Sequence, residues 1–159
     1  MYQFKILLSS TIIILLNLFF ISKLYALGIN DLRIQKLHDF EYAWGMDLID
    51  NENLLVSEKK GTLYIYNFST GKIVGKEVYN DVLPRRQGGL LDIIFVNNMK
   101  KNYVFSCYQD LNSNLIVARH ELKNFKFYNK KIIFSSNYKS KSGVHFGCRF
   151  INYKNNILF

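Results

Sequence analysis

Short apolar runs separated by polar turns make up nearly all of the chain beyond residue 30. The runs are rich in Ile, Val, Leu, Tyr and Phe, and clusters of Asn, Asp, Gly, Lys and Ser separate them, which is typical of β-strands and shows no helical period. The pattern predicts strands at 44–49, 53–58, 61–68, 72–78, 88–95, 102–109, 114–122, 125–134, 143–151 and 155–159. We therefore expect an all-β protein with two sets of four antiparallel strands and an incomplete third set.

The strand sets resemble one another in sequence. WGMDLIDNENLLV, from Trp44 to Val56, and FGCRFINYKNNILF, from Phe146 to Phe159, share an aromatic-Gly start, an apolar run, an Asp or Asn turn and an Asn-led second strand. Two repeats of about 51 residues fit between them, and in the middle repeat Asp92 matches Asp47. A four-stranded unit at this spacing is typical of a β-propeller blade, whereas a β-sandwich of eight or more strands is the alternative.

The number of predicted blades is small for a closed ring. Propellers contain four to eight blades, and this chain offers two blades and the start of a third. An incomplete array leaves an apolar blade face without a neighbour. We expect the chain to be the N-terminal part of a longer protein.

The N-terminus has the plan of a secretory signal peptide. Lys5 precedes an apolar run from Ile6 to Ile21, and the small residue Ala26 follows. A basic start, an apolar stretch and a small-residue cleavage site are its three parts, although Leu24 is large for the cleavage motif. The prediction is a signal peptide at 1–26, with an uncleaved membrane anchor as the alternative, and a propeller domain at 27–159. The folded part would then be periplasmic or secreted.

The net charge of +9 invites a nucleic-acid interpretation, which the distribution of the cations argues against. Lysines outnumber arginines 16 to 5 and are spread through the turns. Arginine is the usual reader of base edges, so its scarcity favours a solvated surface with no nucleic-acid partner.

The cysteines and two of the histidines receive only ordinary structural interpretations. Cys107 and Cys148 both lie in apolar strand patterns, so two buried thiols are expected, although an exported chain also permits a disulfide. His38 and His120 lie in charged segments predicted to be exposed and without partners. No spacing typical of a metal site is present.

Two polar residues mark the mouths of the first strands of the second and third blades. Gln87 precedes the strand in RRQGGLLDI, and His145 lies at the start of the run in SGVHFGCRF. If Arg149 registers with Asp92, then Gln87 and His145 face the same rim of the central channel, which is a natural ligand site.

Strand alternation and the neighbouring glycines refine this prediction. Alternation places the odd-numbered residues from His145 to Arg149 on one face and the even-numbered residues from Val144 to Phe150 on the other. The glycine pairs at 88–89 and at 143 and 147 would let backbone or ligand approach closely. A core histidine bonded to a carbonyl is the alternative for His145.

These stretches carry a family resemblance. AWGMDLIDNENLLVSEKKGTLYIY, RRQGGLLDIIF, NLIVARHEL and SGVHFGCRFINYKNNILF resemble, in order and spacing, segments of the soluble quinoprotein glucose dehydrogenases. The chain is most similar to their aldose sugar dehydrogenase branch, and the similarity covers about residues 42–159. The Gln-Gly-Gly-Leu-Leu-Asp motif and the His-x-Gly-x-Arg motif together make a specific pair.

The resemblance implies a fold, a reaction and roles for two residues. The family fold is a six-bladed propeller that binds pyrroloquinoline quinone (PQQ) and calcium. Oxidation of the C1 hydroxyl of an aldose passes a hydride to the quinone and later its electrons to an acceptor. His145 matches the general base and Gln87 the active-site glutamine near the sugar. The quinone-binding and calcium-binding residues of the family lie in later blades, so no cofactor-binding or metal-binding residue is assigned here.

Two other classes of function compete with the dehydrogenase. A non-catalytic exported propeller could use the same blades for binding or interaction, but it would need neither Gln87 nor His145. A propeller lactonase would need carboxylates clustered at the rim, which the sequence lacks. For this chain alone we expect no activity.

Overall fold

The structure is a computed structural model that describes residues 32–159, except for residues 99, 140–141, 145 and 155. The predicted signal peptide or anchor at 1–26 lies outside the described residues. The chain divides into two units, Met1–Lys36 and Leu37–Phe159, and the fold described below belongs to the second. No helix able to cross a membrane occurs in the described part of the chain.

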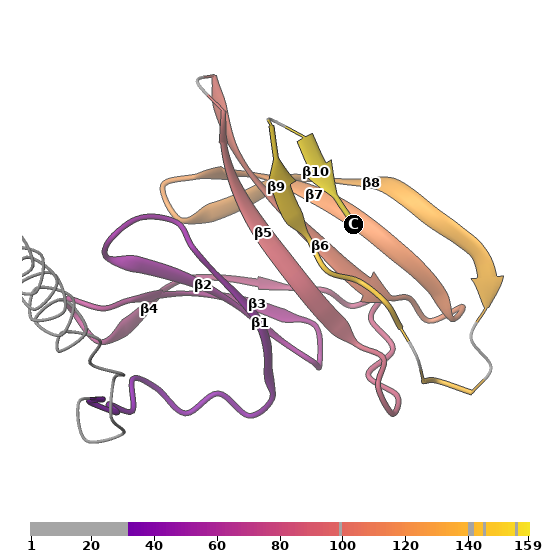
Figure 1. Ribbon diagram of the computed structural model, residues 1–159, viewed down its shortest axis with the longest axis horizontal. Coiled ribbons are helices and arrows are strands. Elements are labelled where there is room, and N and C mark those ends of the chain that lie inside the picture. The colour runs from indigo at the N-terminus through magenta and orange to yellow at the C-terminus, as the bar shows by residue number, and fades with distance from the viewer. Residues whose placement is uncertain (1–31, 99, 140–141, 145, 155) are drawn as a thin grey trace, which may run out of the picture. The chain divides into compact units, whose positions relative to one another are not determined.

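The second unit is built from antiparallel strands (Figure 1). The first sheet, in spatial order, contains β1 (Ala43–Leu48), β2 (Asn53–Glu58), β3 (Thr62–Asn67) and β4 (Lys72–Val78). The second sheet contains β5 (Leu90–Asn98), β6 (Lys101–Gln109), β7 (Asn114–Lys123) and β8 (Lys126–Lys139). A separate hairpin contains β9 (Ile151–Tyr153) and β10 (Asn156–Leu158). The prediction of two four-stranded sheets and an incomplete third is confirmed.

The predicted strand at 143–151 is wrong over most of its length. The described residues from Gly143 to Phe150 form no ladder, and β9 begins only at Ile151. From Phe146 to Phe150 the residues nevertheless alternate between half-buried and exposed, with Gly147 and Arg149 exposed, as predicted. The segment is therefore extended, but contacts other than a strand ladder hold it.

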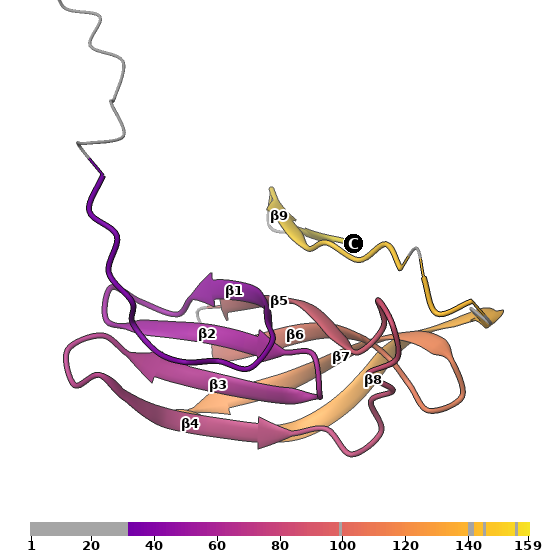
Figure 2. The same ribbon diagram turned by 90° about the horizontal axis from the view of Figure 1, so that it is seen from below.

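The two complete sheets pack face to face (Figure 2). The core between them contains Leu55, Leu63 and Ile65 from the first sheet and Leu90, Ile93, Val104, Tyr108, Ile116, Ala118 and Leu122 from the second. Burial of these side chains removes apolar surface from water and so stabilises the contact between the sheets. A polar contact crosses the same interface, because the Ser57 hydroxyl in β2 donates to the Leu91 carbonyl in β5 at 2.6 Å.

One hydrogen bond recurs from blade to blade and supports the predicted repeat. The Asp47 carboxylate in β1 accepts from the Phe95 amide at 2.7 Å, and the Asp92 carboxylate in β5 accepts from the Phe150 amide at 2.7 Å. Asp47 and Asp92, matched from the sequence, thus occupy equivalent positions. The sequence alignment paired Arg149 with Asp92, but this contact pairs Phe150 with Phe95. Because Phe95 lies three residues beyond Asp92 and Phe150 only one beyond Arg149, the third repeat is shifted by two residues from the predicted alignment.

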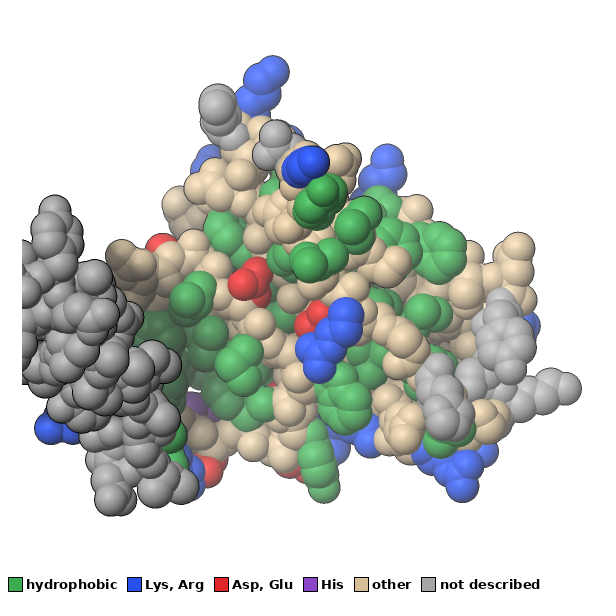
Figure 3. All heavy atoms as spheres, in the orientation of Figure 1, with side chains coloured by type: hydrophobic (Ala, Val, Ile, Leu, Met, Phe, Trp, Pro, Cys, Tyr) green, Lys and Arg blue, Asp and Glu red, His purple; other side chains and the backbone are tan. Residues whose placement is uncertain are grey.

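Apolar side chains gather on one face over β1, β5 and the β9–β10 hairpin (Figure 3). On β1 the exposed large residues are Trp44, Met46 and Leu48, and on the hairpin they are Ile151, Tyr153 and Leu158. An exposed apolar surface of this kind is typical of a face that binds another chain segment or another protein.

Candidate active site at the strand mouths

The Gln87 loop leads into β5 and makes a tight turn. The Gly88 amide donates to the Arg85 carbonyl at 2.8 Å, and the Leu90 amide donates to the Lys59 carbonyl at 3.0 Å. The Lys59 ammonium also donates to the Arg86 carbonyl. The first blade therefore holds the loop of the second, and the Gln87 side chain lies exposed at its tip.

Two glycines allow this close approach. A Cβ atom at position 88 would lie 1.9 Å from the Gln109 Oε1 atom, and one at position 89 would lie 2.4 Å from the Lys59 carbonyl oxygen. Gly89 also has φ of 128°, a conformation that strongly favours glycine. The sequence predicted close approach at these glycines, and the groups that approach are the protein's own.

The structure brings the two predicted strand mouths together. The Gln87 amide donates to the Gly143 carbonyl at 3.0 Å, and the Arg86 guanidinium donates to the Ser142 carbonyl at 3.0 Å. His145 itself lies outside the described residues. What the structure describes is therefore the contact between the loop of Gln87 and the segment that carries His145 in the sequence.

A disulfide fastens the same segment from its other end. Cys107 in β6 is bonded to Cys148, so the prediction of two free thiols is wrong. Cys107 is fully buried and Cys148 half-buried. Alternation assigned both residues to apolar faces but carried no information on whether those faces meet, and the bond takes the place of the missing strand ladder.

The described residues fit the implied cofactors unequally. The exposed Gln87 amide and the neighbouring arginines, Arg85 and Arg86, could face a sugar hydroxyl or one edge of an anionic quinone. The Arg86 guanidinium is already bonded to a carbonyl, so these groups form at most one side of a site. No cluster of three or more His, Cys, Asp or Glu side chains suited to a metal occurs within the described ranges. They therefore fit no calcium centre.

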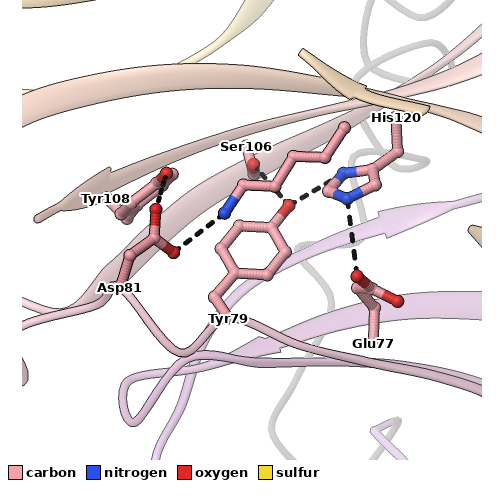
Figure 4. A network of polar contacts seen from close by, with 7 residues as sticks. Glu77, Tyr79, Asp81, Ser106, Tyr108 and His120 are labelled. Atoms are coloured by element: carbon pink, nitrogen blue, oxygen red, sulfur yellow. Dashed lines mark hydrogen bonds and ion pairs between the residues drawn. The ribbon is translucent and has the colours of Figure 1, made fainter. Parts of the chain in front are cut away.

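His120 is the third correction to the sequence-based interpretation. Its side chain is 1% exposed and belongs to a polar network between β4, β6 and β7 (Figure 4). The Nδ1 atom lies 3.0 Å from the Tyr79 hydroxyl, which lies 2.8 Å from the Ser106 hydroxyl. The Nε2 atom lies 3.7 Å from the Glu77 carboxylate. By contrast His38 is exposed, as predicted, although its ring packs on Phe40 and Tyr66.

Lys130 joins a second part of this network. Its ammonium lies 3.9 Å from the centre of the Tyr79 ring and bonds the Asp81 carboxylate at 2.8 Å, which also accepts from the Tyr108 hydroxyl at 2.7 Å. Burial alone would raise the pKa of Asp81, but the bonds from Lys130 and Tyr108 lower it. Burial is also the main reason that the pKa values of Tyr79 and Tyr108 are raised. The network joins the end of the first blade to the middle of the second.

Acid should lower the stability of the fold through the buried His120. Burial, with a smaller effect of the Lys130 charge, lowers the pKa of His120 from 6.5 to about 4. The unfolded chain takes up a proton as the pH falls below 6.5 and native His120 does not, so stability falls between pH 6.5 and 4, by about 3 kcal/mol at most. Urea unfolding at a series of pH values measures this loss.

A matched variant isolates the imidazole. His120→Asn retains Glu77 and Asp81 and can still bond the Tyr79 hydroxyl, so it should lack the loss between pH 6.5 and 4. The lowered pKa of Asp81 adds a loss that begins about one pH unit above the ordinary value of 3.8, but both proteins share it, so the difference between the two profiles still reports His120. Equal pH profiles for the two proteins would show that His120 titrates normally in the native state.

Comparison with known proteins identifies the family. The model of the glucose/sorbosone dehydrogenase family matches residues 40–159. No curated protein matches the chain. Among solved structures, a glucose dehydrogenase is 24% identical with a TM-score of 0.59, and the match covers 73% of this chain and 36% of that one.

Two further structures give the same fold. The soluble aldose sugar dehydrogenase of Escherichia coli, in its apo-form, is 22% identical with a TM-score of 0.56 over 70% of this chain and 34% of that one. A putative oxidoreductase (glucose dehydrogenase) of Thermus thermophilus is 17% identical with a TM-score of 0.59, over 69% of this chain and 33% of that one. The chain thus spans about a third of the length of these structures. It has the blades of a β-propeller, and it belongs to the glucose/sorbosone dehydrogenase family.

Proposed function

We propose that the chain is the N-terminal part of an exported PQQ-dependent dehydrogenase that oxidises the C1 hydroxyl of aldose sugars. The observation that carries the proposal is the hydrogen bond from the Gln87 backbone amide to the Gly143 carbonyl. It joins the first motif of the resemblance, 87–92, to a residue two positions before the second motif, 145–149, and both motifs lie within the range matched by the family.

The chemistry assigned to each residue follows from its side chain. Removal of the sugar hydroxyl proton needs a base with a pKa near neutrality, which an imidazole such as His145 provides. The exposed side-chain amide of a glutamine such as Gln87 can donate a hydrogen bond to one sugar oxygen and accept one from a second hydroxyl, and so orients C1. The quinone, when bound, would supply the hydride acceptor.

The remaining parts of the site belong to the rest of the proposed protein. Further blades would cover the exposed apolar face over β1 and the hairpin, and would bring the groups that hold PQQ and calcium. The protein would be periplasmic or secreted after removal of 1–26, and would pass electrons from the sugar to a separate acceptor. A chain with 27–159 alone should neither bind PQQ tightly nor oxidise sugar.

The proposal is tested with the complete protein encoded by the gene of this chain, incubated with PQQ and calcium. We expect aldose-dependent reduction of a redox dye that requires PQQ, and a Gln87→Ala rate about tenfold lower, since loss of a positioning hydrogen bond worth about 1.4 kcal/mol lowers the rate by this factor. Gln87→Glu, which keeps the shape and one acceptor, is the matched control and should lose less. Absence of dye reduction from all aldoses would instead favour a non-catalytic binding module.

A further inference from the structure

Gln109 lies at the mouth end of β6, directly beneath the Gln87 loop. The backbone nitrogen of Gln109 donates to the Gly89 carbonyl at 3.0 Å, and its backbone carbonyl accepts from the Leu83 backbone amide at 2.8 Å. The two ends of the segment 83–89 therefore both bond to the main chain of this one residue. The Gln109 side chain, 1% exposed, extends into the space that the loop encloses.

The side-chain amide of Gln109 has no hydrogen-bond partner among the described residues. Neither its Nε2 nor its Oε1 atom is bonded. Burial of an unpaired amide is unfavourable, and an apolar side chain of the same shape would be neutral or stabilising at such a position. Sites that break this rule are commonly functional, because the protein retains a group there at the expense of stability.

The amide also defines the residue that can lie above it. The Oε1 atom would lie 1.9 Å, and the Cδ atom 3.0 Å, from a Cβ atom at position 88. Gly88 therefore lies against the amide with no side chain between them. The amide forms the floor on which the Gln87–Gly89 backbone turns.

We propose that Gln109 is a positioning residue of this site, which sets the path of the Gln87–Gly89 backbone and thereby the direction of the Gln87 side chain. The expected effect of Gln109 on catalysis rests on the proposed function. Its effect on the path of the loop does not, because that path can be measured without any substrate. The polar atoms, rather than the volume, carry this role, since an amide dipole against a bare glycine backbone favours one orientation of the turn.

The test replaces Gln109 with methionine, which keeps the length and removes the polar atoms. In the full chain, we expect Gln109→Met to unfold at an equal or higher urea concentration, while hydrogen exchange at the Gly88 backbone amide, which donates to the Arg85 carbonyl, becomes at least tenfold faster. Tyr108→Phe is the matched control. Tyr108 precedes Gln109 in β6, and loss of its hydroxyl removes a hydrogen bond to Asp81. The variant should therefore unfold at a lower urea concentration, while the Gly88 amide keeps its protection from hydrogen exchange relative to the rest of the chain.

Two further measurements keep the proposal open to refutation. Gln109→Glu retains an uncharged carboxyl at low pH, so protection of Gly88 should approach that of the parent there and be lost as the pH rises. In the complete protein, Gln109→Met should lower kcat about tenfold with KM changed less than threefold. Unchanged exchange at Gly88 in Gln109→Met would overturn the proposal, whereas changed exchange in a protein without dehydrogenase activity would overturn only the proposed function.

Discussion

Replacement of both cysteines with alanine should lower the free energy of unfolding by about 4 kcal/mol. The bond between Cys107 and Cys148 closes a loop across a sequence separation of 41 residues. In the chain-entropy account, closing a loop of this size restricts the unfolded chain by about 3–5 kcal/mol. The segment 142–150 has no strand ladder in its described part, so without the disulfide it would be held mainly by single hydrogen bonds, such as those of Gly143 to Gln87 and of Phe150 to Asp92.

Urea unfolding of the oxidised chain and of the Cys107→Ala, Cys148→Ala double variant measures this difference. The single variant Cys148→Ala is the control for the volume of the buried Cys107 thiol, which stays in place. Hydrogen exchange should also show that the Gln87 amide loses protection, because its acceptor, the Gly143 carbonyl, lies in the released segment. Two titratable thiols in the native protein would contradict the disulfide.

The strands could be predicted because their signals are local. β2 and β4 coincide with the predicted ranges, since a short apolar run and the turn residues at each end fix them without reference to the rest of the chain. The repeat was equally visible, because Asp47 and Asp92 stand at equivalent positions in similar sequences. The recurring hydrogen bond to the next blade then gave this match a physical meaning.

The errors share a cause, which is that long-range packing left no local signal. His120 follows Arg119 in a charged stretch and appeared exposed, yet Glu77 at the end of β4 and Tyr79 just beyond it contact its buried ring. The segment at 143–150 has the alternation of a strand, but its described residues form no ladder of backbone hydrogen bonds with a neighbouring strand. The same limit applies to Gln109, which looks like an ordinary strand end in the sequence. Only the position of Gly88 above it could have served as a signal, as the second residue of a Gln-Gly-Gly turn.

The largest functional effect is expected from His145→Gln in the complete protein. Glutamine fills a similar space and can still donate a hydrogen bond, but its amide cannot accept the hydroxyl proton near neutral pH. Loss of a general base commonly lowers the rate by about 100-fold to 10,000-fold. We therefore expect sugar oxidation to fall by this factor while PQQ binding, measured by the absorbance of the retained quinone, stays within about threefold of the parent.

The pH dependence separates a base from a structural histidine. In the parent, kcat/KM should rise with pH through the pKa of His145, because only the neutral imidazole accepts a proton. Residual activity of His145→Gln should lack this rise, whereas Gln87→Ala should keep it at a lower rate, since that variant leaves the base in place. Retention of sugar oxidation within about threefold of the parent, with the same pH profile, would mean that His145 only packs against its surroundings and that another group takes the proton.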